Sequence, residues 1–300
     1  MEKVSVIIPT YSRPDNLLRA INSVLSQTYQ DIEIIVVDDN GIGTPYQQET
    51  EKCVKDLIEK GKIIYIKHDI NKNGSAARNT GLKVCTGLYY TFLDDDDYLY
   101  PQKIEKQVQA LKNNKDCDMV YCGFEKKGDK DVIISKCIPC KEGNMQLPLL
   151  KKTWGFGSGS NPLFTRTVYE KVGLFDETYI RHQDLEYMVR AFRHFKICVV
   201  PDILLTKYIN SNSVRPDIRR YEQIKEKFLS DFSEDIAKYD LKEQYKIFRN
   251  NWYELALMAI GKDKVNGWMY FKKASKYTLP NLKQLLKFLI FAILNKEYGR

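Results

Sequence analysis

The chain has 300 residues, of which 43% are hydrophobic and 29% charged, so it can bury a sizeable core as one large or two modest domains, and a disordered chain is excluded. The formal net charge is +8 at pH 7, but residues 262–300 carry nine basic and only two acidic side chains. Because the preceding part is almost balanced, a nucleic-acid partner is disfavoured, and a local surface for something anionic, such as a membrane, is favoured.

The N-terminus and the cysteines indicate a reducing compartment. The first apolar run is too short for a secretory signal, and seven cysteines, an odd number, fit reduced thiols better than a disulfide framework. We therefore expect a cytoplasmic protein. A structural zinc site is a minor alternative because one spacing is loose and no histidine is near; its ligands would be Cys117, Cys122, Cys137 and Cys140. No window reaches the roughly 18 apolar residues that span a bilayer.

The first hundred residues alternate short β-branched runs with longer helical patterns. This alternation predicts an α/β fold, Rossmann-like, with a mainly parallel sheet flanked by helices. Strands are expected at 4–8, 32–37, 63–66 and 89–93, and helices at 15–27, 49–60 and 76–84, with Pro9 ending the first strand. Ligands bind beyond the carboxyl ends of the strands in such sheets, and polar residues follow three of these strands.

The pattern becomes less regular after residue 97. We expect helices at 101–112, near 168 and at 184–194, and strands at 119–124 and 162–165. From residue 216 onward the sequence predicts helices only, with breaks near 239, 261 and 280. The expected division is an α/β domain over 1–212, followed by an all-helical C-terminal region over 213–300 with a basic amphipathic tail.

Four consecutive aspartates, Asp94 to Asp97, directly follow a buried strand. Their charges repel one another strongly unless a cation or tight hydrogen bonding offsets them. Mg²⁺ and Mn²⁺ typically take one or two protein carboxylates and complete their shell with substrate phosphates and water. An Asp-x-Asp at the end of a strand therefore suits a metal-diphosphate complex. A solvated acidic turn in front of the next helix is the alternative interpretation.

Two further segments could contact a nucleotide. Asp39 follows the second strand and can accept hydrogen bonds from a base imide or a ribose hydroxyl, although its Asp-Asn-Gly context also fits a simple turn. Arg78 lies where a loop of small residues enters a helix, and it could clamp phosphate. The sequence has no G-x-G-x-x-G and no Walker motif, which counts against a dehydrogenase or a P-loop enzyme.

Asp184 stands at the start of a predicted amphipathic helix. It is either an N-terminal helix cap or a carboxylate that meets the acidic cluster across a cleft and acts as a general base. Periodicity does not decide between the two. His68 and His194 have no partners at metal or triad spacing, so we expect both to be structural or on the surface.

Six segments, taken in chain order, resemble the family 2 glycosyltransferases of the GT-A fold. They run from Val4 to Tyr208 and read VSVIIPTYSRPDNLLRAINSVLSQTY, IEIIVVDDN, NGSAARNTGL, YYTFLDDDDYLYP, VGLFDE and RHQDLEYMVR. The resemblance implies a GT-A catalytic domain in which an inverting enzyme moves a sugar from a nucleotide-sugar donor to an acceptor hydroxyl.

Matching positions in this family imply roles for individual residues. The expected nucleotide-sugar site comprises Pro9, Thr10, Tyr11, Arg13, Asp39, Arg78, Asp94 and Asp95; the metal ligands, for Mn²⁺ or Mg²⁺, are Asp96 and Asp94; and the catalytic base is Asp184. The sequence departs from the common pattern at Gly41, where Ser is frequent, and at Gln183, where an acid often precedes the base. The second departure leaves the base assignment resting on Asp184 alone.

The resemblance implies transfer of a single sugar, because the transmembrane segments and the Q-x-x-R-W motif of a processive synthase are missing. We expect a UDP-linked donor and a saccharide or lipid-linked acceptor, in assembly of bacterial capsule, lipopolysaccharide or exopolysaccharide. A nucleotidyltransferase and a non-catalytic nucleotide-sugar binding module remain open.

The tail over 280–300 has an apolar stripe flanked by Lys283 and Lys287. This pattern is typical of a helix lying in a membrane interface, and equally of a helix docked on its own domain. The first interpretation predicts a peripheral contact with the inner face of the cytoplasmic membrane.

Overall fold

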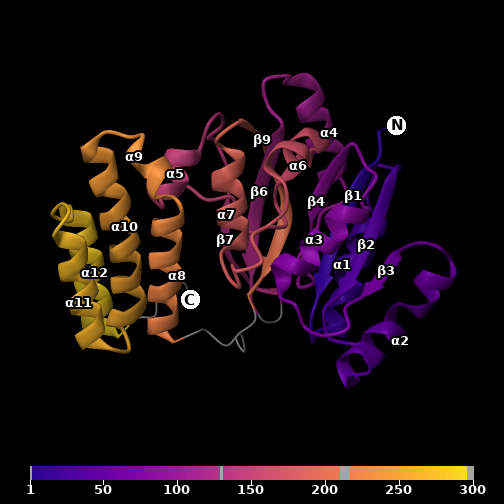
Figure 1. The fold of residues 1–300 in the computed structure, drawn as a ribbon, viewed down its shortest axis with the longest axis horizontal. Coiled ribbons are helices and arrows are strands. Elements are labelled where there is room, and N and C mark those ends of the chain that lie inside the picture. Colours follow the sequence, from indigo (N-terminus) through magenta and orange to yellow (C-terminus); the bar gives the residue numbers. More distant parts are fainter. Residues whose placement is uncertain (1, 129–130, 210–216, 296–300) are drawn as a thin grey trace. The chain divides into compact units, whose positions relative to one another are not determined.

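The computed structural model describes residues 2–128, 131–209 and 217–295, which divide into two compact units (Figure 1). The α/β unit comprises Met1–Gln146 and Phe156–Ser213, and the helical unit comprises Leu147–Gly155 and Val214–Arg300. The short segment Leu147–Gly155 belongs with the helices near the C-terminus, which no feature of the sequence predicted. The assignment of catalysis to 1–212 stays a prediction.

A single mixed sheet of nine strands forms the centre of the α/β unit, in the order β3-β2-β1-β4-β8-β6-β9-β5 with β7 paired to β6. The strands β1 to β4 pair in parallel, whereas β5, β7 and β8 run antiparallel to their partners. The expected α/β fold is therefore confirmed. The strands are β1 (Val4–Thr10), β2 (Ile32–Asp38), β3 (Ile64–Lys67), β4 (Tyr89–Phe92), β5 (Asp97–Leu99), β6 (Met119–Lys127), β7 (Ile133–Cys137), β8 (Leu163–Thr165) and β9 (Ile197–Tyr208).

Helices cover both faces of this sheet. Successive side chains of β1 point to opposite faces, so Val6 and Ile8 join a core with α1, α2 and α4, while Ile7 faces α3. A Cβ on Gly81 of α3 would lie 2.3 Å from Ile7 Cγ2, so glycine permits this close approach. The helices up to residue 191 are α1 (Pro14–Leu25), α2 (Pro45–Glu59), α3 (Gly74–Val84), α4 (Lys103–Asn113), α5 (Gln146–Leu150), α6 (Arg166–Val172) and α7 (Gln183–Ala191).

Two strands that contain a proline differ from the expectations. The strand β9 was not expected, because Pro201 interrupts its pattern and proline cannot donate to a sheet ladder. The structure accommodates it in an irregularity: Cys122 pairs with Val200, the next residue of β6 pairs with Ile203, and Pro201 is skipped. The expectation that Pro9 ends β1 is also wrong, because β1 continues to Thr10 with Pro9 paired to Val37.

The helical unit contains the helices predicted beyond residue 216, and side-chain caps define three of their starts. Asp240 and Asp263 each accept a hydrogen bond from the backbone amide three residues ahead, and Asn281 forms a capping box with Gln284. None of the helices in the described ranges is long and apolar enough to cross a membrane. The helices are α8 (Ile218–Asp231), α9 (Ser233–Ala237), α10 (Leu241–Ile260), α11 (Lys264–Ser275) and α12 (Leu282–Leu294).

The contact between α10 and α11 depends on Gly267, and Gly267→Ala tests it. A Cβ at this position would lie 2.6 Å from Ile260 Cα, which is backbone and cannot move aside as a side-chain tip would. We expect a loss of about 1–3 kcal/mol in the free energy of unfolding from overpacking, measured by urea denaturation. The control is Gly155→Ala, where a Cβ would meet nothing within 4 Å; equal stability of the two variants would contradict the prediction.

Candidate active site

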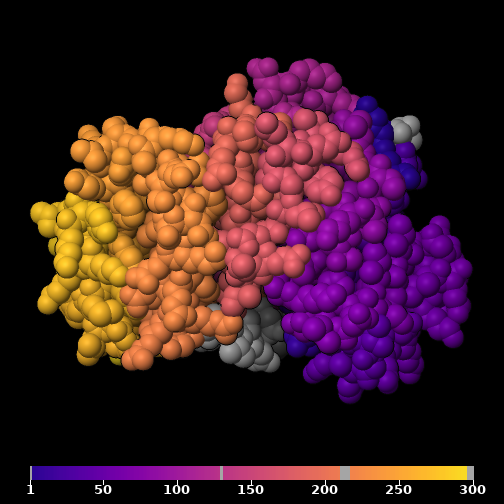
Figure 2. Space-filling model, in the orientation of Figure 1, coloured from indigo at the N-terminus to yellow at the C-terminus, as the bar shows by residue number. Residues whose placement is uncertain are grey.

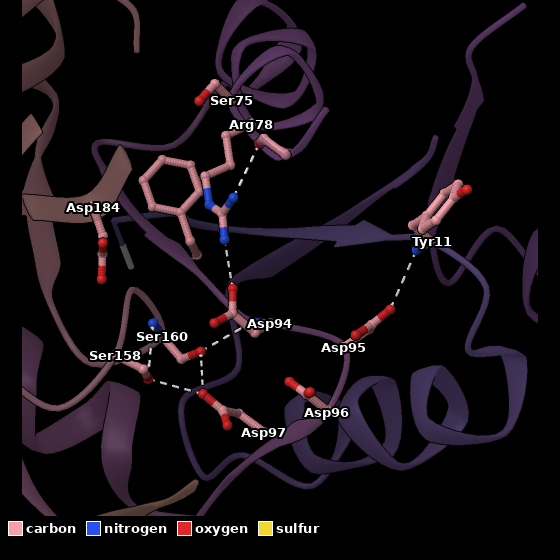
Figure 3. A network of polar contacts seen from close by, with 12 residues as sticks. Tyr11, Ser75, Arg78, Asp94, Asp95, Asp96, Asp97, Ser158, Ser160 and Asp184 are labelled. Carbon is pink, nitrogen blue, oxygen red and sulfur yellow. Dashed lines mark hydrogen bonds and ion pairs between the residues drawn. The ribbon is translucent and has the colours of Figure 1, made fainter. Parts of the chain in front are cut away.

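The carboxyl ends of β1, β2 and β4 bring polar residues to one edge of the sheet. Thr10, the last residue of β1, pairs with Asp38, the last residue of β2, and the amide of Asp39 donates to the Thr10 carbonyl over 3.0 Å. On the other side of β1, β4 ends just before the four aspartates. The expected gathering of the strand ends is thus present. Figure 3 shows three of the residues at this edge of the sheet, Tyr11, Asp94 and Asp95.

Asp95 is the buried member that joins the acidic cluster to β1. Its Oδ2 accepts a hydrogen bond from Thr10 Oγ1 over 2.8 Å and one from the Tyr11 amide over 3.4 Å. Its Oδ1 lies 3.0 Å from Arg13 Nη2, an ion pair without hydrogen-bond geometry. Burial raises the pKa of Asp95 to about 7, although the charge of Arg13 opposes the shift. The carboxyl group therefore titrates close to neutral pH.

Asp94 and Asp96 are partly exposed, and each is paired with an arginine. Asp94 Oδ1 lies 2.5 Å from Arg78 Nη2, whereas Asp96 Oδ2 pairs with Arg13 Nη1. The two carboxylate side chains are 29% and 26% exposed, respectively. Burial raises the pKa of Asp96, and the neighbouring charge of Asp94 adds to the effect while Arg13 opposes it. The two arginines thus stabilise two like charges that must lie close together.

Asp94 and Asp96 fit a divalent cation by their chemistry. Both offer hard carboxylate oxygens that are partly open to solvent, and each uses one oxygen for its arginine. Within the described ranges, no group of three or more His, Cys, Asp or Glu side chains is arranged to enclose a metal. A metal here would therefore rely on one or two protein carboxylates, with phosphate oxygens and water as its other ligands.

Asp97 has a different surrounding and orders a loop. Its Oδ2 accepts hydrogen bonds from Ser158 Oγ over 2.8 Å and from Ser160 Oγ over 2.6 Å (Figure 3). Ser160 Oγ in turn accepts from the Asp94 amide over 2.9 Å. The Gly/Ser segment before β8 is therefore tied to the acidic cluster, although the sequence analysis named neither serine. A signal was available, because Gly and Ser allow a chain to approach a carboxylate closely.

Lys207 is a further residue that the sequence analysis missed. It lies on β9, opposite Asp97 in the antiparallel pair of β5 and β9. Burial alone would lower its pKa, but the carboxylates of Asp97, Asp94, Asp184 and Asp96 outweigh this effect and raise it. Lys207 thus supplies a positive charge among the acids, and it could not be found before β9 was recognised.

Asp184 lies in the first turn of α7 and faces the same site. The cap position itself is His182, in the left-handed conformation with φ 60°, so Asp184 is not the N-cap. A Cβ on Gly159 would lie 3.6 Å from Asp184 Cβ and 3.9 Å from Arg78 Nη2, so both residues flank this glycine. Burial raises the pKa of Asp184, while Lys207 and Arg78 oppose the shift. Figure 3 shows Asp184 and Tyr11 on opposite sides of Asp94.

Asp39 is held by three donors of its own chain. His68 Nδ1 lies 2.7 Å from Oδ1, the Lys72 amide donates to the same oxygen over 2.8 Å, and Asn71 Nδ2 donates to Oδ2 over 2.9 Å. A carboxylate offers about four acceptor positions, so these three donors leave about one of them over, on a side chain that is 4% exposed. His68 also contacts Thr80 Oγ1 over 2.8 Å, which makes this histidine a structural residue, as expected.

The four cysteines of the zinc alternative do not form one group. Cys117 and Cys122 are buried, whereas Cys137 and Cys140 are exposed, and all seven cysteines are free thiols. Over the described residues, these cysteines belong to no cluster of three or more metal-binding side chains.

Lys103 is a fully buried lysine that supports the loop at the acidic cluster. Its Nζ donates to Gln107 Oε1 over 2.8 Å, and Gln107 Nε2 donates to the Asn161 carbonyl over 3.0 Å. Burial lowers the pKa of Lys103 to about 8, although the charge of Asp97 counteracts the shift. A charge that lacks a close carboxylate partner in the described chain is thus held inside the α/β unit.

An α/β sheet of this kind, with carboxylates and arginines gathered beyond its parallel strands, is the arrangement of a nucleotide-sugar transferase of the GT-A fold. Residues 5–173 match the glycosyl transferase family 2. An uncharacterized glycosyltransferase of Rickettsia prowazekii is 31% identical over 291 residues, covering 89% of this chain and 87% of that protein. The chain therefore belongs to glycosyl transferase family 2 and is a glycosyltransferase.

Two further proteins are similar. The UDP-Glc:α-D-GlcNAc-diphosphoundecaprenol β-1,3-glucosyltransferase WfaP of Escherichia coli is 37% identical over 115 residues, which are 38% of this chain and 43% of WfaP. The mannosyltransferase PcManGT of Pyrobaculum calidifontis, solved with GDP-Man and Mn²⁺, has a TM-score of 0.60 at 18% sequence identity. The match covers 98% of this chain and 80% of the PcManGT chain. The second likeness shows a shared fold.

Lys103→Met should raise the free energy of unfolding at pH 7 and reduce its rise at alkaline pH; the lowered pKa of Lys225 still contributes to that rise. Between the folded pKa of about 8 and the ordinary lysine value near 10.4, the unfolded chain binds more protons than the folded one, so stability increases with pH there. Below pH 8, burying the charged Lys103 costs on the order of 3 kcal/mol of folding free energy. The variant recovers this cost, less the contribution of the hydrogen bond to Gln107 that it loses. Urea denaturation from pH 7 to 10.5 measures both effects.

The matched control is Lys106→Met on the same helix, where the side chain is 39% exposed and pairs with Asp202. We expect this variant to keep the pH dependence of the unmodified chain. If both variants show the same profile, the alkaline rise does not come from Lys103.

Proposed function

We propose that the chain is a metal-dependent inverting glycosyltransferase that moves one sugar from a nucleotide-sugar donor, UDP-linked, to a hydroxyl of a saccharide or lipid-linked saccharide. The observation that carries this proposal is the meeting of Asp184, from the second half of the α/β unit, with Arg78 and the aspartates after β4. A carboxylate with a raised pKa beside a cluster suited to a metal-diphosphate has the parts that glycosyl transfer needs.

The reaction would proceed by one displacement at the anomeric carbon. Asp184 takes the proton of the acceptor hydroxyl, the hydroxyl oxygen forms the new bond to the anomeric carbon, and the bond from that carbon to the diphosphate oxygen breaks. The electron pair of that bond leaves with the nucleoside diphosphate. Attack from the face opposite the leaving group inverts the configuration. The raised pKa of Asp184 suits a base, since proton transfer is most effective when the pKa approaches the working pH.

The cations of the site stabilise the leaving diphosphate. Arg13, whose side chain is 42% exposed, and Arg78 beside Asp94 lie where the phosphates would approach the acidic cluster. Asp96 and Asp94 would hold Mn²⁺ or Mg²⁺, which supplies positive charge to the diphosphate oxygens when bound. PcManGT, solved with Mn²⁺, supports this by the shared fold.

The similarity to WfaP supports the proposed donor and acceptor classes. WfaP carries UDP-Glc and a diphosphoundecaprenol-linked acceptor in its name, and its similarity covers 38% of this chain. We propose that Thr10, Tyr11 and Pro9 line the nucleotide, that Asp95 meets the ribose, and that the remaining acceptor position of Asp39 meets the base. Assembly of a bacterial surface polysaccharide is the process that this pair of substrates suggests.

We also propose peripheral contact with the inner face of the cytoplasmic membrane through α12. On this helix Phe288 is buried, stacking on Phe271 at 4.3 Å, whereas six apolar side chains are exposed. The helix is thus anchored on its own unit and still presents apolar surface, so the two interpretations of the tail are compatible. Residues 296–300 of the tail lie outside the described ranges. The exposed apolar side chains are Leu282, Leu285, Leu286, Ile290, Ile293 and Leu294.

The metal site and the donor class are tested together by thermal stabilisation with UDP, GDP, CDP and dTDP, each with Mn²⁺ or with chelator. A ligand at about one hundred times its Kd adds roughly 2.7 kcal/mol, which is readily visible. We expect one nucleotide to stabilise the chain, more strongly with Mn²⁺, and Asp96→Ala to lose the metal-dependent part of the shift. Asp56→Ala, which removes an 82% exposed carboxylate from α2, is the control. An equal loss in chelator would contradict a metal role for Asp96.

Asp184→Asn tests the base. We expect the rate of transfer to fall by about 10²–10⁴ because the amide cannot accept the proton, while the Kd of the donor nucleotide stays the same. Product analysis accompanies the assay: a glycosyltransferase releases nucleoside diphosphate, a nucleotidyltransferase releases pyrophosphate, and a binding module releases neither. Retained transfer in Asp184→Asn would remove this residue as the base.

A further inference from the structure

The helical unit contains a cavity that the proposed reaction does not use. It has a volume of about 270 Å³ and lies between the turn after α5, one face of α10 and the start of α12. Ligand pockets for drug-sized molecules usually hold roughly 300–1,000 Å³, so this one suits a small group rather than a nucleotide-sugar. Its lining residues include Lys152, Asn250, Glu254, Lys283 and Lys287.

Hydrogen bonds within the helical unit fix the walls of this cavity. Asn250 Nδ2 donates to the Lys151 carbonyl over 2.7 Å, which ties the turn to α10, and Tyr253 Oη donates to the Gln284 carbonyl over 2.6 Å, which ties α12 to α10. Lys152 adopts the left-handed conformation, with φ 56°, which a residue with a side chain rarely does. The turn that presents its ammonium group is thus held in a costly conformation.

The charged side chains that line the cavity are mostly positive. Three lysines line it together with one carboxylate, that of Glu254. Glu254 Oε2 lies 2.6 Å from the buried Lys225 Nζ but 3.9 Å from Lys152 Nζ. Glu254 therefore interacts more strongly with Lys225 than with Lys152. Lys283 and Lys287 stand four residues apart on α12, a spacing at which like charges repel. An anion in the cavity would relieve this repulsion.

An apolar surface continues from these lysines along α12. The residues Lys283, Lys287, Ile290 and Leu294 follow one another at intervals of four, three and four, so they form one stripe on the helix. Ile290 is 47% exposed and Leu294 57% exposed. The yellow atoms of the last helices lie at the surface in Figure 2. The stripe therefore offers ammonium groups at one end and apolar side chains at the other.

We propose that this cavity is a binding site for the phosphate or diphosphate group of a lipid, whose hydrocarbon chain lies along the apolar end of the α12 stripe. The ammonium groups of Lys152 and Lys283 contact the phosphate oxygens. The phosphate could belong to a bulk anionic lipid or to a lipid-linked acceptor. The second source rests on the proposed function, whereas the site itself does not.

The test uses the full chain and three kinds of vesicle: phosphatidylcholine alone, phosphatidylcholine with phosphatidylglycerol, and phosphatidylcholine with a few per cent of a polyprenyl diphosphate. Sedimentation measures binding, and inorganic diphosphate with chelator present is the soluble competitor. The double variant Lys152→Gln, Lys283→Gln is compared with Lys264→Gln, Lys272→Gln, which removes the same charge from α11, outside this cavity.

We expect the cavity variant to lose binding to the phosphate-bearing vesicles by roughly tenfold or more, and to lose competition by diphosphate, which the α11 variant retains. Preference for the polyprenyl diphosphate would identify the acceptor as the source, and equal binding to phosphatidylglycerol would identify bulk lipid. Equal losses in the two double variants, or no loss in the cavity variant, would overturn the proposal. UDP stabilisation and transfer to a soluble acceptor are measured beside it, so failure of the proposed function would be seen separately.

Discussion

The repulsion among four consecutive aspartates is the constraint on which the α/β unit depends. The chain resolves it by sending alternate side chains in different directions. Asp95 and Asp97 are buried and receive hydrogen bonds from hydroxyl groups, whereas Asp94 and Asp96 stay partly exposed and pair with arginines. Each partner comes from a distant part of the sequence, including β1, α3, the Gly/Ser loop and β9. The charge cluster therefore requires the fold, and the fold positions the cluster at the edge where ligands of such sheets bind.

The sequence was informative where structure is local and periodic. The alternation of β-branched runs with amphipathic helices predicted the parallel strands β1 to β4, and parallel pairing then required Thr10, Asp39 and Asp94 to meet at one edge. The family motifs added Asp184, which no periodic pattern could assign. Geometry now places it beside Arg78, although its role as a base stays a prediction.

The parts that were missed depend on pairing between distant segments. Lys207 reaches the aspartates only because β9 pairs with β5 and β6, and Pro201 concealed that strand. Ser158 and Ser160 donate hydrogen bonds to Asp97, which lies about sixty residues earlier in the chain. His68 has no partner at a recognisable sequence spacing because Asp39 and Thr80 come to it through the sheet and α3. All of these contacts join residues that are far apart in the sequence, so the spacing of residues along the chain does not predict them.

The two units hold unbalanced charges of opposite sign, and the sign indicates the ligand of each. In the α/β unit, arginines and Lys207 offset the aspartates only in part, so burial still raises the pKa of Asp95 and Asp96. In the helical unit, Glu254 is shared between Lys225 and Lys152, so burial and the neighbouring lysine lower the pKa of Lys225 to about 8. A bound cation would lower the first pair of pKa values, and a bound anion would raise the last. The same electrostatic argument supports the proposed metal-diphosphate at one site and the proposed lipid phosphate at the other, from contacts within each unit alone.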